Sequence, residues 1–124
     1  MPSCTFKKSQ RLLNASDFRG VFEHNRVKVA NNSLLILAKP AQGRQSRLGL
    51  VIAKKNIPTA VQRNRLKRVV RETFRQQEFD APMDIVFLAR SGANRQTTKE
   101  LTPLLRHAWI KLAQRSKPLR TESA

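Results

Sequence analysis

The residues of this sequence that could do chemistry are gathered in one short segment. They are six cations and one amide: Arg63, Asn64, Arg65, Lys67, Arg68, Arg71 and Arg75. An arginine presents a planar fork of N–H donors that matches the oxygens of a phosphate, whereas a lysine offers a compact point charge. The chemistry that this segment predicts is the binding of a polyanion through its phosphates.

A helix over residues 60–75 would place these side chains on one surface. At about 100° per residue, the less polar residues of the segment fall on a single arc: Leu66, Val69, Val70, Thr73 and Phe74. Thr59 is the expected N-cap, and Gln62, three residues later, completes the pattern of a capping box. If the arc packs on a sheet, the rest of the helix presents an almost uninterrupted cationic face.

A charged helix face is often no more than a solvated surface. An ordinary solvated face mixes both signs, because oppositely charged pairs at i, i+4 stabilise a helix and like charges destabilise it. In residues 60–75, however, Glu72 is the only acid, and Lys54 and Lys55 extend the positive region before the helix. We therefore predict that this face binds nucleic acid.

The charge of the whole chain points to the same class of partner. Its 124 residues include 25 Lys+Arg and 8 Asp+Glu, a formal net charge of +17. Such an excess repels itself in a compact fold, and a polyanion relieves the repulsion. No apolar run approaches the ~18 residues of a membrane span, and the first residues lack the apolar stretch of a signal peptide. We expect a cytoplasmic protein that binds RNA rather than a membrane; DNA is less expected, because no helix-turn-helix or zinc pattern is present.

The acidic residues do not suggest a nuclease that works without RNA. Such an enzyme needs carboxylates clustered around metal ions. The eight acids are scattered, with Glu78 and Asp80 the closest pair, and His24 and His107 stand far apart in sequence. We predict no catalytic residue and no metal site in the chain.

The remaining pattern predicts one small domain that supports the basic helix. We expect a helix near 14–25 capped by Asn14 or Ser16, extended segments at 27–38, 47–53 and 84–90, and a last helix near 98–115. The first extended segment can break at Asn31-Asn32, and Pro103 is expected in the first turn of the last helix. Residues 1–10 are expected to form a basic arm, 11–115 a single RNA-binding domain, and 116–124 a disordered tail.

The stretch VIAKKNIPTAVQRNRLKRVVRETFR, residues 51–75, resembles the signature of the bacterial ribonuclease P protein subunit. In that family a strand ending in Lys-Lys leads into a helix with Arg-Asn-Arg, then Lys-Arg, then a further Arg. The similarity continues through RLLNASDFRGVF (11–22), RLGLVIAKK (47–55) and DIVFLAR (84–90), so that it covers most of the chain.

The resemblance implies an α+β fold of order αβββαβα. Its four-stranded sheet has a left-handed crossover through the basic helix, as in the second domain of certain ribosomal proteins and against the usual rule. The implied function is that of the RNA-binding subunit of ribonuclease P, which removes the 5′ leader of precursor tRNA. One copy of the protein would bind the ribonuclease P RNA, and that RNA would hold magnesium and perform the hydrolysis. A non-catalytic ribosomal or ribosome-assembly protein explains the charge equally well, but the residue order at 63–71 favours ribonuclease P.

The resemblance also implies a cleft for the leader between the first helix and the sheet. The residues that match its lining are Phe18, Phe22, Leu35, Leu37, Lys54 and Lys55. Aromatic stacking beside a cationic groove is how proteins hold single-stranded RNA, although an i, i+4 aromatic pair is more often simple core packing. Some family members carry an aromatic where Leu37 stands, and a leucine stacks less well on a base. Further RNA contacts are expected at Arg11, Arg47 and Arg90, whereas Trp109 is expected in the core.

Overall fold

A sheet of four strands organises the computed structural model, which describes residues 15–41, 45–79 and 81–123. Along these ranges the elements are α1 (Ala15–His24), β1 (Val27–Ala30), β2 (Leu34–Pro40), β3 (Arg47–Val51), α2 (Ala60–Arg75), β4 (Met83–Ala89), the 3-10 helix η3 (Ser91–Arg95) and α3 (Thr98–Ser123). The strands lie in the order β1-β2-β4-β3. Both β1 and β4 run antiparallel to β2, and β3 runs parallel to β4.

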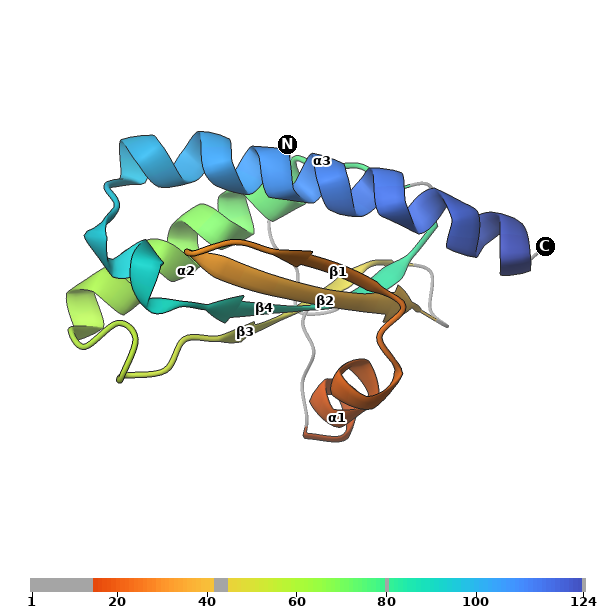
Figure 1. Ribbon diagram of the computed structural model, residues 1–124, viewed down its shortest axis with the longest axis horizontal. Helices are drawn as coiled ribbons and strands as arrows, with labels where there is room; N and C mark the ends of the chain where they lie inside the picture. Colours follow the sequence, from red (N-terminus) through yellow and green to blue (C-terminus); the bar gives the residue numbers. More distant parts are fainter. Residues whose placement is uncertain (1–14, 42–44, 80, 124) are drawn as a thin grey trace.

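The basic helix is the connection between the two parallel strands. From the end of β3 the chain enters α2, passes along one face of the sheet and returns to β4 (Figure 1). This arrangement confirms the expected α+β fold and the αβββαβα order of its main elements, to which η3 adds one short turn. The left-handed course of the crossover remains what the resemblance implies, since strand order and direction do not fix it.

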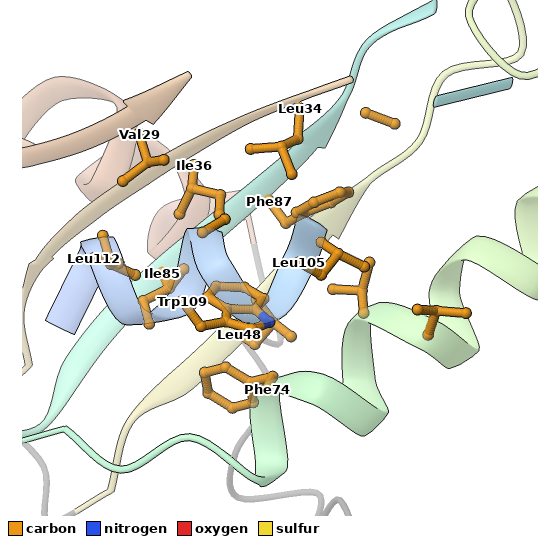
Figure 2. Packing of buried hydrophobic residues seen from close by; sticks show 14 of the residues in the cluster. Val29, Leu34, Ile36, Leu48, Phe74, Ile85, Phe87, Leu105, Trp109 and Leu112 are labelled. Atoms are coloured by element: carbon orange, nitrogen blue, oxygen red, sulfur yellow. The ribbon is translucent and has the colours of Figure 1, made fainter. Parts of the chain in front are cut away.

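Successive side chains of each strand point to opposite faces of the sheet, and one of these faces packs against α2 and α3. Leu48 and Phe87 belong to the large core cluster on this face, and Trp109 of α3 is fully buried in it, as expected. Figure 2 shows the Trp109 ring beside Phe74 of α2, and the two ring centroids are 5.5 Å apart in an edge-to-face arrangement. All five residues of the arc predicted on α2 are buried, so the charged side of that helix faces away from the sheet.

The opposite face of the sheet is covered in part by α1 (Figure 1). Val21 of α1 is buried against Leu37 of β2 and Val86 of β4. Around this small cluster pack four partly buried residues: Phe18, Leu35, Val51 and Leu88. The ten-residue helix therefore leaves part of an apolar sheet face accessible beside it.

The predicted break at Asn31-Asn32 is a tight turn between β1 and β2. Asn31 Oδ1 accepts hydrogen bonds from the N–H groups of Ser33 (2.7 Å) and Leu34 (3.0 Å). The side chain thus takes the place of a backbone partner, as Asn does in many turns. Gly92 of η3 lies against this turn, because a Cβ at Gly92 would stand 2.9 Å from the carbonyl carbon of Asn32.

The helix caps agree with the sequence only in part. Thr59 Oγ1 accepts a hydrogen bond of 3.3 Å from the N–H of Gln62, as predicted. The return bond of the capping box is absent at this site, since Gln62 Oε1 is buried and has no hydrogen-bond partner. Ser16 is wrong as a cap for α1, because the helix begins at Ala15; Asn14, the other candidate, lies outside the described residues.

The last helix is longer than predicted. It continues to Ser123, whereas the sequence pattern predicted an end near residue 115 and a disordered tail at 116–124. At the predicted end the helix is attached to the sheet: Arg115 donates a hydrogen bond to the Lys28 carbonyl of β1, and Ser116 is buried. Pro103 stands in the second turn rather than the first, because the helix already begins at Thr98.

Candidate nucleic-acid interface

The outer side of α2 carries the predicted cations. Asn64 and Arg68 are exposed. The other five residues of the set are half-buried: Arg63, Arg65, Lys67, Arg71 and Arg75. The helix therefore brings the whole set together on one element, with its buried arc as the foundation. We call this surface, residues 63–75 of α2 apart from the buried arc, the basic face.

Two arginines of the basic face also hold neighbouring backbone. Nη1 of Arg63 donates to the carbonyl oxygens of Ile57 (3.0 Å) and Pro58 (2.9 Å), in the turn before α2. Nη2 of Arg65 donates to the carbonyl oxygen of Gln96 at 3.0 Å, between η3 and α3. A guanidinium has five N–H donors, so each of these side chains can fix the backbone and still meet a phosphate.

Two further features of α2 were missed by reasoning from charge alone. Arg75 is paired with Glu72, one helical turn before it. Val61, in the first turn, is 78% exposed and precedes Asn64 and Arg65 by about one turn of the helix. The helical spacing could have found it, because Val61 falls outside the buried arc. The basic face thus begins next to an apolar side chain.

A cleft of about 620 Å³ lies between α1 and the sheet. It is lined by Ala15, Phe18, Arg19, Phe22, Glu23 and Val51. Phe22 is 43% exposed and Phe18 is partly buried, so the aromatic pair forms an open wall and not a closed core. Arg19 adds a positive charge beside the rings. We call this pocket the α1 cleft.

The other residues predicted in the cleft differ in how accessible their side chains are. Leu35 is partly accessible on the same sheet face. Leu37 is only 8% exposed beneath α1, so it offers little surface to a ligand. Lys54 and Lys55 are exposed in the turn that follows β3, shortly after Val51. The sequence did not single out Val51, although alternation along β3 puts it on the face opposite Leu48 and Leu50.

The three arginines predicted as further RNA contacts differ in the partners that they have within the protein. Arg47 donates from Nε and Nη2 to the two carboxylate oxygens of Asp84, at 2.9 and 2.8 Å, and its Nη1 lies 3.5 Å from Asp17 Oδ2. The hydrogen bond to Asp84, with the charges of both acids, raises the pKa of Arg47 above its ordinary value against the opposing effect of burial. Arg90 is exposed and donates to the Asn31 carbonyl at 3.1 Å. Arg11 lies outside the described residues.

The acidic and histidine side chains that the structure describes do not gather around a common point. Within residues 15–41, 45–79 and 81–123, no three His, Cys, Asp or Glu side chains come together as they would around a metal ion. The buried carboxylate of Asp84 is engaged by Arg47. The basic face offers positive charge and hydrogen-bond donors, and the α1 cleft offers apolar area.

Comparison with known proteins decides which family has this arrangement. A family model described as Ribonuclease P matches residues 6–113. The chain belongs to the ribonuclease P protein family. The match spans the residues of both the basic face and the α1 cleft.

Individual ribonuclease P proteins support the assignment at the level of sequence and fold. The ribonuclease P protein component of Saccharophagus degradans is 40% identical over 116 residues, which cover 93% of this chain and 86% of that protein. The solved RNase P protein of Staphylococcus aureus is 26% identical with a TM-score of 0.72, over 89% of this chain and 97% of that one. The solved RNase P protein of Thermotoga maritima is 30% identical with a TM-score of 0.62, over 78% of this chain and 96% of that one. In the part of this family member that the structure describes, no helix has the length and apolarity needed to cross a membrane.

Proposed function

We propose that the chain is the RNA-binding protein subunit of a ribonuclease P, the enzyme that removes the 5′ leader of precursor tRNA. The observation that carries the proposal is the family match over residues 6–113, together with two separate binding surfaces on the described fold. One surface is a strongly cationic side of a helix; the other is an apolar cleft with an aromatic wall. Two surfaces of such different chemistry suit two different RNA segments.

The basic face suits the RNA subunit of the enzyme. A structured RNA presents rows of backbone phosphates, and arginines bind them through charge-assisted hydrogen bonds. Arg68 and Asn64 are exposed on this face, and Lys67 and Arg71 stand beside them. Arg63 is bonded to the turn before α2, and Arg65 is bonded to the Gln96 carbonyl between η3 and α3, so both side chains are held in place by the protein itself. A preformed surface binds with a smaller loss of conformational entropy.

The α1 cleft suits the single-stranded leader. Unpaired bases stack on aromatic side chains, and every base has a π-face, so the contact tolerates different sequences. Phe22 offers the most exposed aromatic surface at the cleft, and Arg19 stands beside it. Lys54 and Lys55 are placed to attract the backbone of a strand that leaves the cleft past the end of β3. Leu37, buried beneath α1, would support the floor without touching a base.

The chemical step is proposed to belong to the RNA. Magnesium supplies Lewis-acid and nucleophile-activating chemistry in phosphodiester hydrolysis, and in this proposal the RNA subunit and the substrate phosphates hold it. The protein side chains then bind and orient the precursor tRNA, with one protein per RNA. This division needs no catalytic residue in the chain.

Reconstitution tests the proposal directly. The cognate ribonuclease P RNA and a precursor tRNA are mixed at near-physiological magnesium, with and without this chain, and release of the 5′ leader is measured. We expect faster cleavage with the chain, and tighter binding of precursor tRNA than of mature tRNA. The chain alone should cleave nothing. Equal rates with and without the chain would contradict the proposal and favour a ribosomal or ribosome-assembly role, which would show instead as binding to ribosomal RNA.

A further inference from the structure

Three charged residues from three different elements meet at one end of the α1 side of the sheet. Arg47 is the first residue of β3, Asp84 is its register partner on β4, and Asp17 lies in the first turn of α1. The guanidinium of Arg47 joins them: Nη2 is 2.8 Å from Asp84 Oδ2 and Nη1 is 3.5 Å from Asp17 Oδ2. One side chain thus connects two strands to the helix that forms the wall of the α1 cleft.

The direction of the Arg47 side chain is fixed by the sheet. Asp84 is only 4% exposed, and a buried carboxylate is costly unless a charged donor meets it. Two donors of Arg47 bind that carboxylate side by side, a geometry that orients the planar guanidinium. The remaining Nη1 is therefore held toward α1, and Asp17 meets a cation that is already in place.

The helix at the other end of this contact packs on β2 and β4 of the sheet. A helix of ten residues is not stable alone in water, so packing must hold it. Val21 supplies the buried contact, against Leu37 and Val86. Asp17 immediately precedes Phe18, and Phe22 follows one turn later, so the ion pair lies next to the aromatic wall.

We propose that the Arg47–Asp17 ion pair, anchored by Asp84, sets the position of α1 over the sheet and so holds the α1 cleft open for single-stranded RNA. Arg47 and Asp17 are then positioning residues, which do not touch the RNA. This inference rests on the proposed function, because it assigns the cleft to the leader. It also replaces the expectation, based on sequence, that Arg47 contacts RNA itself.

The charge of Asp17 makes the test sharp. Removing an acid from an RNA-binding protein should, by charge alone, tighten its binding to every RNA. The positioning role predicts weaker binding instead, and only for precursor tRNA, which carries the 5′ leader. In Asp17→Asn we expect the affinity for precursor tRNA to fall by about fivefold, the order of weakening one stacking interaction, while the affinity for mature tRNA does not fall. Glu78→Gln is the matched control: it removes one exposed carboxylate outside the cleft and should show the charge effect alone.

A second variant separates the ion pair from effects within α1. Arg47→Lys keeps the positive charge but cannot bind both acids with a fork, and it leaves the sequence of α1 intact. We expect the same selective loss for Arg47→Lys, and no additional loss in the double variant. Additive losses, or tighter binding of precursor tRNA by Asp17→Asn, would overturn the proposal.

Hydrogen exchange of the free protein provides a measurement that involves no RNA. Amides of α1 should exchange faster in both Asp17→Asn and Arg47→Lys, while those of α2 keep their wild-type rates. Unchanged exchange in α1 would overturn the positioning role. A wild-type protein that does not prefer precursor to mature tRNA would instead contradict the proposed function, with the exchange result still deciding whether the ion pair holds α1.

Discussion

The indole Nε1 of Trp109 donates a hydrogen bond of 2.8 Å to Oγ1 of Thr73, and both side chains are buried. The Thr73 hydroxyl lies in turn within hydrogen-bond distance of the carbonyl oxygens of Val69 (2.9 Å) and Val70 (3.1 Å). The bond joins α3 to the buried arc of α2. The buried side of the helix that presents the basic face is therefore joined to α3 by this polar contact inside an apolar core.

We expect Thr73→Val to destabilise the protein, although valine has nearly the same shape. The indole N–H would be left without its partner in the core, and an unsatisfied buried donor costs about 1–3 kcal/mol. Thr73→Ser keeps the hydroxyl and is the matched control. Urea unfolding of both variants measures the difference. If valine proved as stable as threonine, the indole bond would have no net importance for stability.

Replacing two glycines by alanine should change the free energy of unfolding in opposite directions. A Cβ at Gly20 in α1 would lie 3.6 Å from Lys39 Nζ, an ordinary contact with a flexible side chain. Gly20→Ala should therefore raise the free energy of unfolding by about 0.5–1 kcal/mol, the usual gain of alanine over glycine in a helix. At Gly92 the added Cβ would meet the backbone of Asn32, so Gly92→Ala should lower the free energy of unfolding by about 1–3 kcal/mol. The same urea titration measures both, and a Gly92→Ala protein as stable as wild type would show that the turn at Asn32 adapts.

The sequence predicts most reliably the features that depend on neighbours along the chain. The buried arc of α2 is right at all five positions, because helical periodicity alone selects them. The Thr59 cap is likewise local. The resemblance supplied what periodicity cannot, namely a single four-stranded sheet and a cleft between that sheet and the first helix.

Interactions between distant segments could not be inferred from the chain in this way. Arg47 and Asp84 stand 37 residues apart in sequence, and their pairing depends on the register of two parallel strands. The sequence showed only an arginine at the start of a predicted strand, expected with Arg11 and Arg90 as a further RNA contact, and gave no sign of its acidic partners. The contact of α3 with β1 is of the same kind, since Arg115 and Lys28 stand 87 residues apart in sequence.

Neutralising Lys67 and Arg68 should weaken binding to the ribonuclease P RNA. Each phosphate that a side chain no longer neutralises should reduce the slope of log affinity against log salt by about one, so the slope for the Lys67→Gln/Arg68→Gln double variant should fall by about two units. The fold should persist, since neither side chain belongs to the buried arc. Arg65 is kept in this test, because its removal would also release the Gln96 carbonyl.

The control for that experiment removes the same charge elsewhere. Lys28 and Lys111 are exposed on β1 and α3, away from α2. Lys28→Gln/Lys111→Gln should alter the salt slope far less than the α2 double variant. Identical slopes for the two double variants would show that net charge, and not the basic face, determines binding.

The neighbouring residues Val21 and Phe22 allow the α1 cleft to be tested against simple packing. Val21 is fully buried, whereas Phe22 is 43% exposed, so the two side chains leave α1 in different directions. Phe22→Ala should cost about 1–3 kcal/mol of binding free energy for precursor tRNA, as expected when a base can no longer stack on the ring. It should leave mature tRNA binding unchanged and the melting temperature only slightly lower. Val21→Ala should lower the free energy of unfolding by about 2 kcal/mol, through reduced burial and the cavity left behind. Binding to both RNAs and thermal unfolding of both variants separate the two roles: a Phe22→Ala protein as unstable as Val21→Ala, with equal losses of affinity for both RNAs, would make Phe22 a packing residue.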